Sequence, residues 1–167
     1  MRIFLVGFMG AGKTSVGSEL ARRLGYPFLD VDQRVEAALG MTVAEVFASL
    51  GEPAFRAEET RQLGLCGRFG DAVVATGGGL FTFPHNRERI RRLGVSVFLD
   101  VPWAEILARL PGKRGERPLF SEPEHAYGLY RSRLPHYRTA DLAVNPNPGE
   151  DPAVLAGRIG LLLEGWR

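Results

Sequence analysis

The sequence has little cysteine: Cys66 is the one cysteine among 167 residues. A lone cysteine excludes an internal disulfide and fits a reducing compartment, so we expect the protein in the cytoplasm. Apolar residues surround it at Leu63, Leu65 and Phe69, in a stretch with helical spacing. We therefore predict a buried, unreactive thiol at this position and not a nucleophile.

Long hydrophobic runs are absent as well. No apolar stretch approaches the roughly 18 residues of a membrane-spanning helix, and the amino terminus enters a predicted strand directly, which leaves no room for a signal peptide. The three histidines, His85, His125 and His136, have neither metal-ligand spacing nor cysteine partners, so no zinc site is predicted. The net charge of +2 is weak support for binding nucleic acid or a membrane, and we expect neither as a partner.

Internal repeats and linker-like stretches are also missing. Hydrophobic residues make up 45% of the chain, and the mean hydropathy is −0.06, as in soluble globular proteins. We therefore expect residues 1–167 to form a single domain with one core.

Lysine is scarce too: of 21 basic residues only two are lysines. One of them, Lys13, stands in residues 7–14, GFMGAGKT, which match the phosphate-binding pattern G-x-x-x-x-G-K-[ST]. Residues 2–6 read as a buried strand, and residues 15–24 have helical spacing, which is the context that the motif needs. A chance glycine-rich turn is the alternative. The pattern predicts a nucleoside triphosphate site in which Lys13 reaches the β- and γ-phosphates and the Thr14 hydroxyl binds Mg²⁺.

Acidic residues follow two of the predicted strands. A short strand over residues 26–30 delivers Asp30, with Asp32 two residues on. Because ligands bind at the carboxyl ends of strands in an open α/β sheet, this pair suggests Mg²⁺ and substrate contacts. Alternatively, Asp32 is only the N-cap of the following helix. A strand over residues 95–100 also ends in an acid, Asp100, and the pattern does not choose between the two strand ends for the metal.

A cation stands near the start of a long helix predicted over residues 54–69. Arg56 lies in the first turn, where a positive charge opposes the helix dipole. The position is a mild indication of function, and an ion pair with Glu52 or Glu59 is an equal alternative. Residues 42–45 before this helix have the capping-box pattern of another helix start.

Three glycines, residues 77–79, follow a third strand predicted over residues 71–76. Glycines at the carboxyl end of a central strand let the backbone approach a ligand closely, and a flexible hinge is the alternative. Residues 111–119 are rich in glycine, proline and cations, which is typical of a solvated loop or of a mobile lid over the phosphates. Beyond them the pattern predicts a helix over residues 124–138, a strand over 140–144 and a helix over 153–166.

Taken together, these motifs resemble those of the shikimate kinases, nearly end to end. The glycine loop occurs in many families, but its combination with the other motifs in this order is a strong signature. Those motifs are residues 30–32 (DVD), 55–59 (FRAEE), 76–79 (TGGG), 117–119 (RPL) and 133–138 (RLPHYR).

The resemblance implies an α/β protein with the three-layer P-loop kinase fold. In that fold a five-stranded parallel sheet of order 2-3-1-4-5 is flanked by helices, with a substrate-binding segment here at about residues 32–60 and a lid at about residues 111–124. Because helices of one chain cover both faces of such a sheet, we expect a monomer.

The resemblance also implies a reaction, transfer of the γ-phosphoryl group of ATP to the 3-hydroxyl of shikimate in aromatic amino-acid biosynthesis. Carried over by position, Asp32 binds substrate hydroxyls and is the candidate base. Arg56 and Arg133 pair with the carboxylate, and the backbone of Gly78 and Gly79 approaches the ring. Planar arginine forks suit a carboxylate, because they give a bidentate geometry that lysine does not.

On the nucleotide side the resemblance implies ATP as co-substrate with Mg²⁺. Asp30 joins the metal shell through water, and Arg109 is similar to the family's adenine-facing arginine. The family often has another arginine in the loop after the last strand, where this chain has residues 145–149, NPNPG, so part of the adenine contact stays open. The implied catalytic residues are Lys13, Asp32 and Arg117, and the implied ATP-binding residues are Gly10, Ala11, Gly12, Lys13, Thr14, Ser15, Arg109 and Arg117, with Thr14 and Asp30 serving the metal.

Two other functions fit the glycine loop. A gluconate kinase or nucleoside monophosphate kinase would share the fold and the phosphate site, but the triple glycine and the pair Arg56 and Arg133 argue against both. A nucleotide-binding regulator without catalysis would need a partner surface, and the sequence has no long apolar stripe to supply one.

Overall fold

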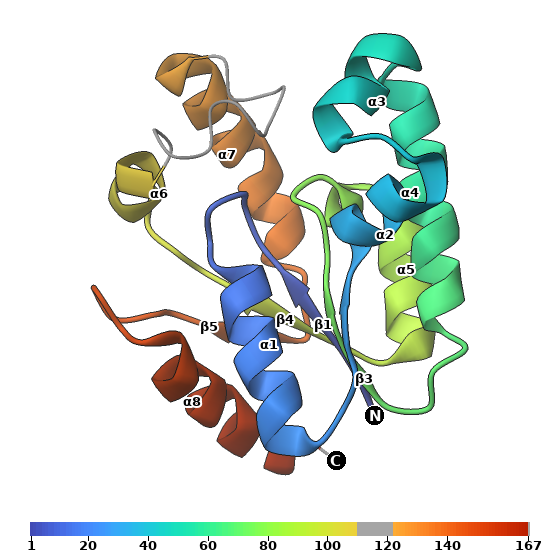
Figure 1. The fold of residues 1–167 in the computed structure, drawn as a ribbon. Helices are drawn as coiled ribbons and strands as arrows, with labels where there is room; N and C mark the ends of the chain where they lie inside the picture. The colour runs from blue at the N-terminus through green and yellow to red at the C-terminus, as the bar shows by residue number, and fades with distance from the viewer. Residues whose placement is uncertain (110–121, 167) are drawn as a thin grey trace.

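The computed structural model describes residues 1–109 and 122–166, in which strands and helices alternate along the chain (Figure 1). The strands are β1 (Arg2–Val6), β2 (Phe28–Asp30), β3 (Ala72–Ala75), β4 (Val95–Leu99) and β5 (Leu142–Val144). The helices are α1 (Lys13–Leu24), α2 (Val31–Leu39), α3 (Val43–Ser49), α4 (Glu52–Cys66), α5 (Pro84–Leu93), α6 (Trp103–Arg109), α7 (Pro123–Tyr137) and α8 (Pro152–Glu164), with a 3₁₀ turn, η1 (Leu80–Thr82).

The described strands form one parallel sheet of order β2-β3-β1-β4-β5, which confirms the predicted fold class and strand order. β1 is central: Leu5 pairs with Ala75 of β3 and with Val97 of β4. Its apolar residues are buried because both faces of the sheet are covered. Since all the strands are parallel, the glycine loop, Asp30 and the triple glycine meet at one edge.

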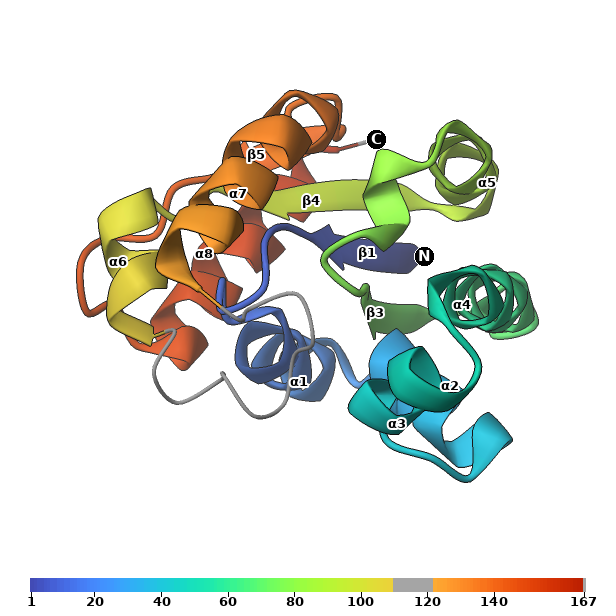
Figure 2. The ribbon, with the colours of Figure 1, turned by 90° about the horizontal axis from the view of Figure 1, so that it is seen from above.

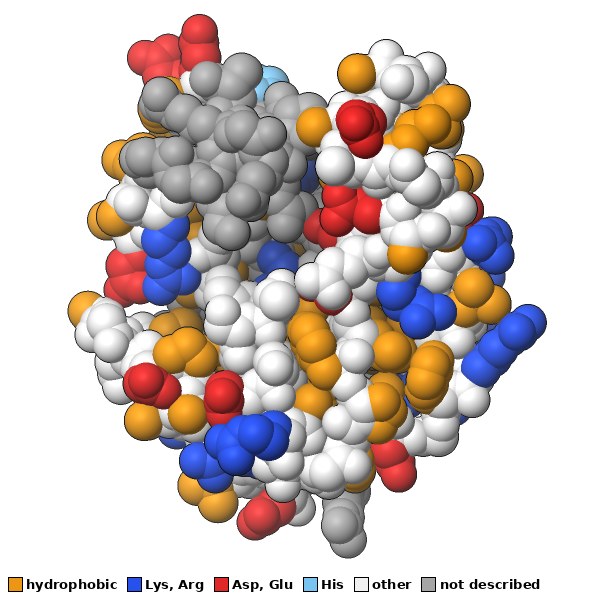
Figure 3. All heavy atoms as spheres, in the orientation of Figure 1, with side chains coloured by type: hydrophobic (Ala, Val, Ile, Leu, Met, Phe, Trp, Pro, Cys, Tyr) orange, Lys and Arg blue, Asp and Glu red, His pale blue; other side chains and the backbone are white. Residues whose placement is uncertain are grey.

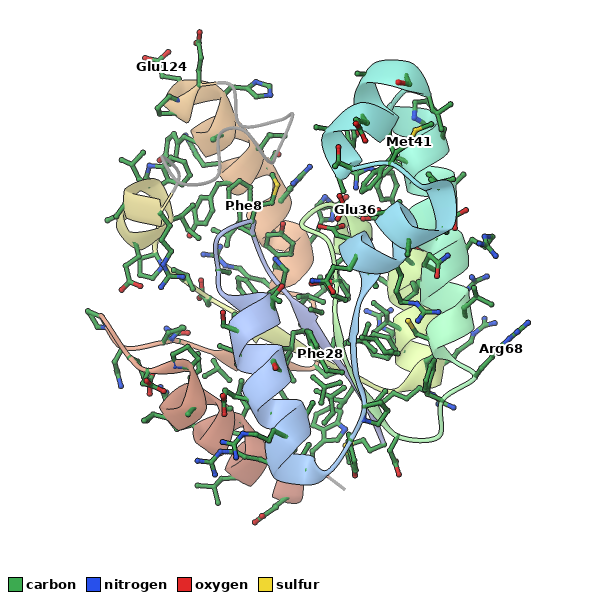
Figure 4. All side chains as sticks on the ribbon, viewed as in Figure 1. Phe8, Phe28, Glu36, Met41, Arg68 and Glu124 are labelled. Atoms are coloured by element: carbon green, nitrogen blue, oxygen red, sulfur yellow. The ribbon has the colours of Figure 1, made fainter. Side chains whose placement is uncertain are left out.

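Helices cover both faces of the sheet. Seen from above, α1 and α8 lie on one side, and α4 and α5 on the other (Figure 2). Gly17 lets α1 pack closely, because a Cβ there would lie 2.7 Å from the ring of Phe28, which is labelled between α1 and β2 in Figure 4. Among the described residues, no helix is both long and apolar enough to cross a bilayer.

The helix after β2 begins at Val31, two residues before the start at Gln33 that a cap at Asp32 would require. Asp30 is its N-cap, and the Asp30 carboxylate accepts the backbone N–H of Gln33 at 3.1 Å. Asp32 therefore lies inside the first turn, and its interpretation as the N-cap is wrong. This shift matters for function, because it places Asp32 among the buried residues, at 9% exposed.

The segment after α2 is held by local polar contacts. The predicted capping box is confirmed: Thr42 accepts the N–H of Glu45 at 3.2 Å, and Glu45 accepts the N–H of Thr42 at 2.7 Å. Glu36, labelled on α2 in Figure 4, accepts the N–H of Val43 at 3.0 Å and so ties α2 to α3. These contacts fix α3 over the edge of the sheet where the loops meet.

The long helix α4 spans Glu52–Cys66, and not residues 54–69. Gly51 caps it with a φ of 86°, and Pro53 fits the first turn, where no intrahelical N–H bond is needed. At its other end Cys66 is fully buried, and burial raises the pKa of the thiol. The predicted buried cysteine is confirmed.

Candidate active site

The glycine loop between β1 and α1 is folded as a phosphate-binding loop. Gly7, Gly10 and Gly12 have φ values of 149°, 82° and 91°, which residues with a side chain rarely adopt. Gly12 is the N-cap of α1, so the amino end of this helix faces the loop. Lys13 donates to the carbonyls of Gly7 at 2.6 Å and Phe8 at 2.9 Å, which places its ammonium group over the loop.

A cavity of about 430 Å³ lies against this loop. Its volume is within the usual range for small-molecule sites, roughly 300–1,000 Å³. Residues 9–16, Asp30, Asp32 and Arg109 line it, and so does the loop after β5. The space-filling view shows the surface hollowed beside α2 and α3, with acidic and basic side chains together there (Figure 3).

A hydroxyl and a carboxylate stand together at the metal side of this cavity. Thr14 Oγ1 donates to Asp30 Oδ2 at 2.9 Å, and both residues line the cavity, whereas Asp100 does not. Oxygen donors of this kind fit Mg²⁺, which usually takes one or two protein ligands and completes its shell with phosphates and water. The described part of the chain has no cluster of three or more potential metal-binding side chains.

A second, smaller cavity of about 30 Å³ adjoins the first, and Met9, Asp32 and Gly78 line both. The remaining lining residues are Val43, Phe47, Phe55, Arg56, Glu59, Gly79 and Arg133. Two arginines and two carboxylates therefore converge next to the phosphate site. They come from α2, α4 and α7, which lie far apart in the sequence.

Arg56 makes both ion pairs that its sequence neighbours allow. Its guanidinium lies 3.3 Å from Glu52 and 3.0 Å from Glu59, and only 15% of the side chain is exposed. It also stacks on the rings of Phe55 and Phe83, with its Cζ 5.2 and 5.5 Å from their centroids. These contacts do not turn it away from the site, because the same guanidinium lines the smaller cavity.

Arg133 reaches the cavity from the opposite side. It is 8% exposed, and its Cζ lies 6.0 Å from the ring centroid of Phe8. Phe8, labelled in Figure 4, belongs to the glycine loop, and its ring packs edge-on against that of Tyr130 on α7, with centroids 5.4 Å apart. The aromatic contact links the phosphate loop to the helix that carries Arg133.

The triple glycine makes room for charged side chains. A Cβ on Gly77 would lie 2.6 Å from Glu59 Oε2 and 2.8 Å from Asp32 Oδ1. The same atom on Gly78 would lie 3.4 Å from the Arg133 guanidinium, and on Gly79 it would lie 2.5 Å from that of Arg56. The prediction that these glycines admit a ligand stays a prediction, but each already admits a side chain of the site.

Glu59 is the residue of the site that sequence reasoning missed. It is fully buried, and among the described residues its Oε2 has no hydrogen-bond partner. Burial raises the pKa of its carboxyl to about 7; the Arg56 guanidinium opposes this rise, and the Asp32 carboxylate adds to it. The signal was present as the glutamate three residues after Arg56, but it indicated only an ion pair with that arginine.

The far end of the larger cavity is built by Arg109 and the loop after β5. Arg109 donates to the carbonyl of Gly10 at 2.6 Å, so it lies beside the phosphate loop. From the opposite wall Pro146 and Asn147 line the cavity. The loop that lacks the family's arginine therefore still faces this cavity.

One predicted site residue cannot be placed. Arg117 and most of the predicted lid, residues 111–124, lie outside the described residues. The other predicted residues, from the glycine loop to Asp32, Arg56, Gly78, Gly79, Arg109 and Arg133, all lie around the two joined cavities.

Comparisons with known proteins agree on one family. The family model for shikimate kinase matches residues 9–161. The chain is 42% identical over 145 residues to shikimate kinase of Rhodopseudomonas palustris, covering 85% of this chain and 71% of that protein. It is 44% identical over 154 residues to that of Cereibacter sphaeroides, covering 88% of this chain and 75% of that protein.

Solved structures give the same result. Shikimate kinase from Acinetobacter baumannii in complex with shikimate superposes with a TM-score of 0.93 at 36% identity, covering 99% of this chain and 94% of that one. Deoxyadenosine kinase from M. mycoides shares only the fold, with a TM-score of 0.66 at 14% identity, covering 99% of this chain and 100% of that one. With the family model and these relatives spanning most of its length, the chain belongs to the shikimate kinase family.

Proposed function

We propose that the two joined cavities bind ATP and shikimate side by side, so that the γ-phosphoryl group passes to the 3-hydroxyl of shikimate. Family membership supports this reaction, which belongs to aromatic amino-acid biosynthesis. The observation that carries the assignment is the pair Arg56 and Arg133. Both guanidinium groups lie at a cavity that shares Asp32 and Gly78 with the phosphate site.

The two arginines would bind the carboxylate of shikimate. Each is mostly buried, so a charge-assisted hydrogen bond there is worth roughly 1.5–3 kcal/mol. The smaller cavity of about 30 Å³ has room for one or two water molecules. We therefore infer that the segment over residues 32–60 moves outward to admit the ring and closes on it, and that the lid over residues 111–124 closes over ATP.

Asp32 would receive or orient the acceptor hydroxyl. It lines both cavities, so it stands where a hydroxyl in the small cavity would face a phosphoryl group in the large one. Phosphoryl transfer needs positioning and charge neutralisation more than covalent help. Lys13 and Arg117 would supply positive charge to the phosphates, together with the N–H groups of residues 10–15.

The family's use of ATP implies a divalent metal, and we propose that it is Mg²⁺. Thr14 would bind it directly and Asp30 through water, since their oxygens already lie together in the larger cavity. When bound, the ion would help to neutralise the negative charge of the phosphates during transfer. Arg109 and the Pro146–Asn147 wall would contact the adenine.

The test is ADP release with shikimate as acceptor, measured on the wild type and on Arg56→Ala. We expect turnover with shikimate and not with gluconate or a nucleoside monophosphate, and a KM for shikimate raised by about 10- to 100-fold in the variant. Arg61→Ala is the matched control, since Arg61 lies on the same helix with 58% of its side chain exposed. Turnover with another acceptor, or an Arg56→Ala enzyme with unchanged KM, would refute the assignment.

We also propose that residues 1–167 act as one domain and as a cytoplasmic monomer, with neither nucleic acid nor membrane as a partner. The covered sheet faces and the small net charge support this. Light scattering of the purified protein, with and without both substrates, measures the oligomeric state directly.

A further inference from the structure

The turn after β3 is held by side chains through its carbonyl groups. From Gly78 to Thr82 every backbone carbonyl accepts a side-chain hydrogen bond. The donors are the Tyr137 hydroxyl for Gly78, Thr82 for Gly79 at 2.6 Å, Asn86 for Leu80 at 3.1 Å, and Arg87 for both Phe81 at 2.9 Å and Thr82 at 2.8 Å. These hydrogen bonds fix the backbone of the turn, and all but that of Thr82 come from side chains outside it.

The bond from Tyr137 has a directional consequence. The carbonyl of Gly78 and the N–H of Gly79 belong to one planar trans peptide, so fixing the carbonyl fixes the N–H to point the opposite way. Among the described residues neither Gly78 nor Gly79 has a protein acceptor for its N–H. Both glycines line the smaller cavity.

The surroundings of Tyr137 restrain the position of its hydroxyl group. It is fully buried, and its ring packs against Phe98 with centroids 5.4 Å apart. Arg133 lies one turn earlier on α7, and its positive charge lowers the pKa of this hydroxyl, against the larger effect of burial. Burial raises the pKa of the Tyr137 hydroxyl, so its proton stays available to the carbonyl across the physiological range.

We propose that Tyr137 is a positioning residue for the acceptor: its hydroxyl aligns the Gly78–Gly79 peptide beside Arg133, so that a backbone N–H and a guanidinium meet the same carboxylate. The identity of that carboxylate rests on the proposed function, whereas the alignment of the peptide does not. Tyr137 itself touches no substrate and acts through the Gly78–Gly79 peptide.

The experiment compares Tyr137→Phe with Tyr130→Phe. Tyr130 is a matched control, because it lies on the same helix and its hydroxyl also donates to a backbone carbonyl, that of Val101, at 3.2 Å. We expect Tyr137→Phe to raise the KM for shikimate by about 10-fold, the effect of losing one hydrogen bond, with the KM for ATP unchanged. Tyr130→Phe should change neither constant.

Hydrogen exchange of residues 77–82 in the substrate-free protein supplies a readout that does not depend on turnover. Tyr137→Phe should speed exchange there, and Tyr130→Phe should not. An unchanged KM for shikimate, an equal rise in both KM values, or unchanged exchange would overturn the proposal.

If Tyr137→Phe does not fold, wild-type exchange decides, since shikimate must slow exchange at Gly79. A wild type without shikimate turnover refutes the proposed function, and exchange in the free variants then still tests the alignment.

Discussion

The backbone of Gly79 packs directly against the guanidinium group of Arg56. A Cβ on Gly79 would lie 2.5 Å from both terminal nitrogens of Arg56, so the guanidinium rests where any side chain would stand. The two residues come from the amino end of η1 and from α4, which are separate elements of the chain. The absence of a side chain at Gly79 therefore makes room for Arg56, in addition to any ligand.

Gly79→Ala should therefore lower the affinity for shikimate without unfolding the protein. The backbone of Gly79 has φ −96° and ψ −16°, which alanine adopts, and the clashing atoms are the far end of a flexible side chain. We expect the KM for shikimate to rise by about 10-fold or more because Arg56 is displaced. Steady-state kinetics and thermal unfolding of the same preparation measure the two effects.

Gly128→Ala is the matched control for that substitution. A Cβ on Gly128, an exposed residue of α7, would meet no atom within 4 Å. Alanine there should raise the free energy of unfolding by about 0.5–1 kcal/mol through helix propensity and leave both KM values unchanged. Equal kinetic effects at the two glycines would contradict the role given to Gly79.

The buried carboxyl of Glu59 predicts a pH-dependent stability. Its pKa rises from an ordinary value of 4.5 to about 7 in the fold, so folding favours the protonated form. This contribution is complete below pH 4.5 and is lost as the pH rises to about 7. Urea unfolding of the wild type and of Glu59→Gln should show the variant gaining stability relative to the wild type over that interval, by at most about 3 kcal/mol.

Glu58, the preceding residue on α4, should make the free energy of unfolding depend on pH in the opposite direction. A hydrogen bond from Arg61 lowers the pKa of its carboxyl despite partial burial. Its stabilising contribution is present above the ordinary pKa and is lost as the pH falls through the lowered value. Glu58→Gln should thus be less stable than the wild type at neutral pH, and this difference should disappear at acidic pH. If the stabilities of Glu58→Gln and Glu59→Gln, each relative to the wild type, changed with pH in the same direction, the assignment for Glu59 would be contradicted.

Most of the fold could be predicted, because each strand is an apolar run and each turn has its own glycine, proline or cap. The site was less accessible. Asp30 and Asp32 differ by two positions, and only the observed N-cap shows which one caps the helix and which turns to the cavity. The hydroxyl of Tyr137 bonds a carbonyl 59 residues away, and such a contact has no local pattern. Glu59 is similar, because its carboxylate lies close to Gly77 and Asp32, which are on other elements.

The loop after β5, which has no arginine of its own, is held in place by an ion pair between Glu150 and Arg158. Glu150 accepts two hydrogen bonds from Arg158, at 2.7 and 2.8 Å, and one from the N–H of Asn147 at 2.9 Å. Arg158 also donates to the carbonyl of Asn145 at 3.3 Å. This pair orders the wall of the cavity that Pro146 and Asn147 form.

Arg158→Ala should accordingly raise the KM for ATP by roughly five-fold, the order expected when a charge-assisted contact that orders a loop is lost. The KM for shikimate should not change, because Arg158 lies on α8, away from the smaller cavity. Arg22→Ala, which breaks an ion pair with Glu19 whose arginine is 70% exposed, is the control and should leave the KM for ATP as it is.

Asp30 has two tasks that substitution can separate. One carboxylate oxygen caps α2 by accepting the N–H of Gln33, and the other accepts the Thr14 hydroxyl at the proposed metal site. Asparagine caps a helix as well as aspartate does, and its amide can still meet Thr14, but it lacks the charge. Asp30→Asn should therefore raise the Mg²⁺ concentration needed for half-maximal activity by about 10- to 100-fold with stability unchanged.

Asp30→Ala removes both tasks, so it should lose about 1 kcal/mol of unfolding free energy in addition. Titration of activity with Mg²⁺, beside urea unfolding without metal, distinguishes these outcomes. A variant Asp30→Asn that keeps the wild-type Mg²⁺ requirement would leave Asp30 as a helix cap alone.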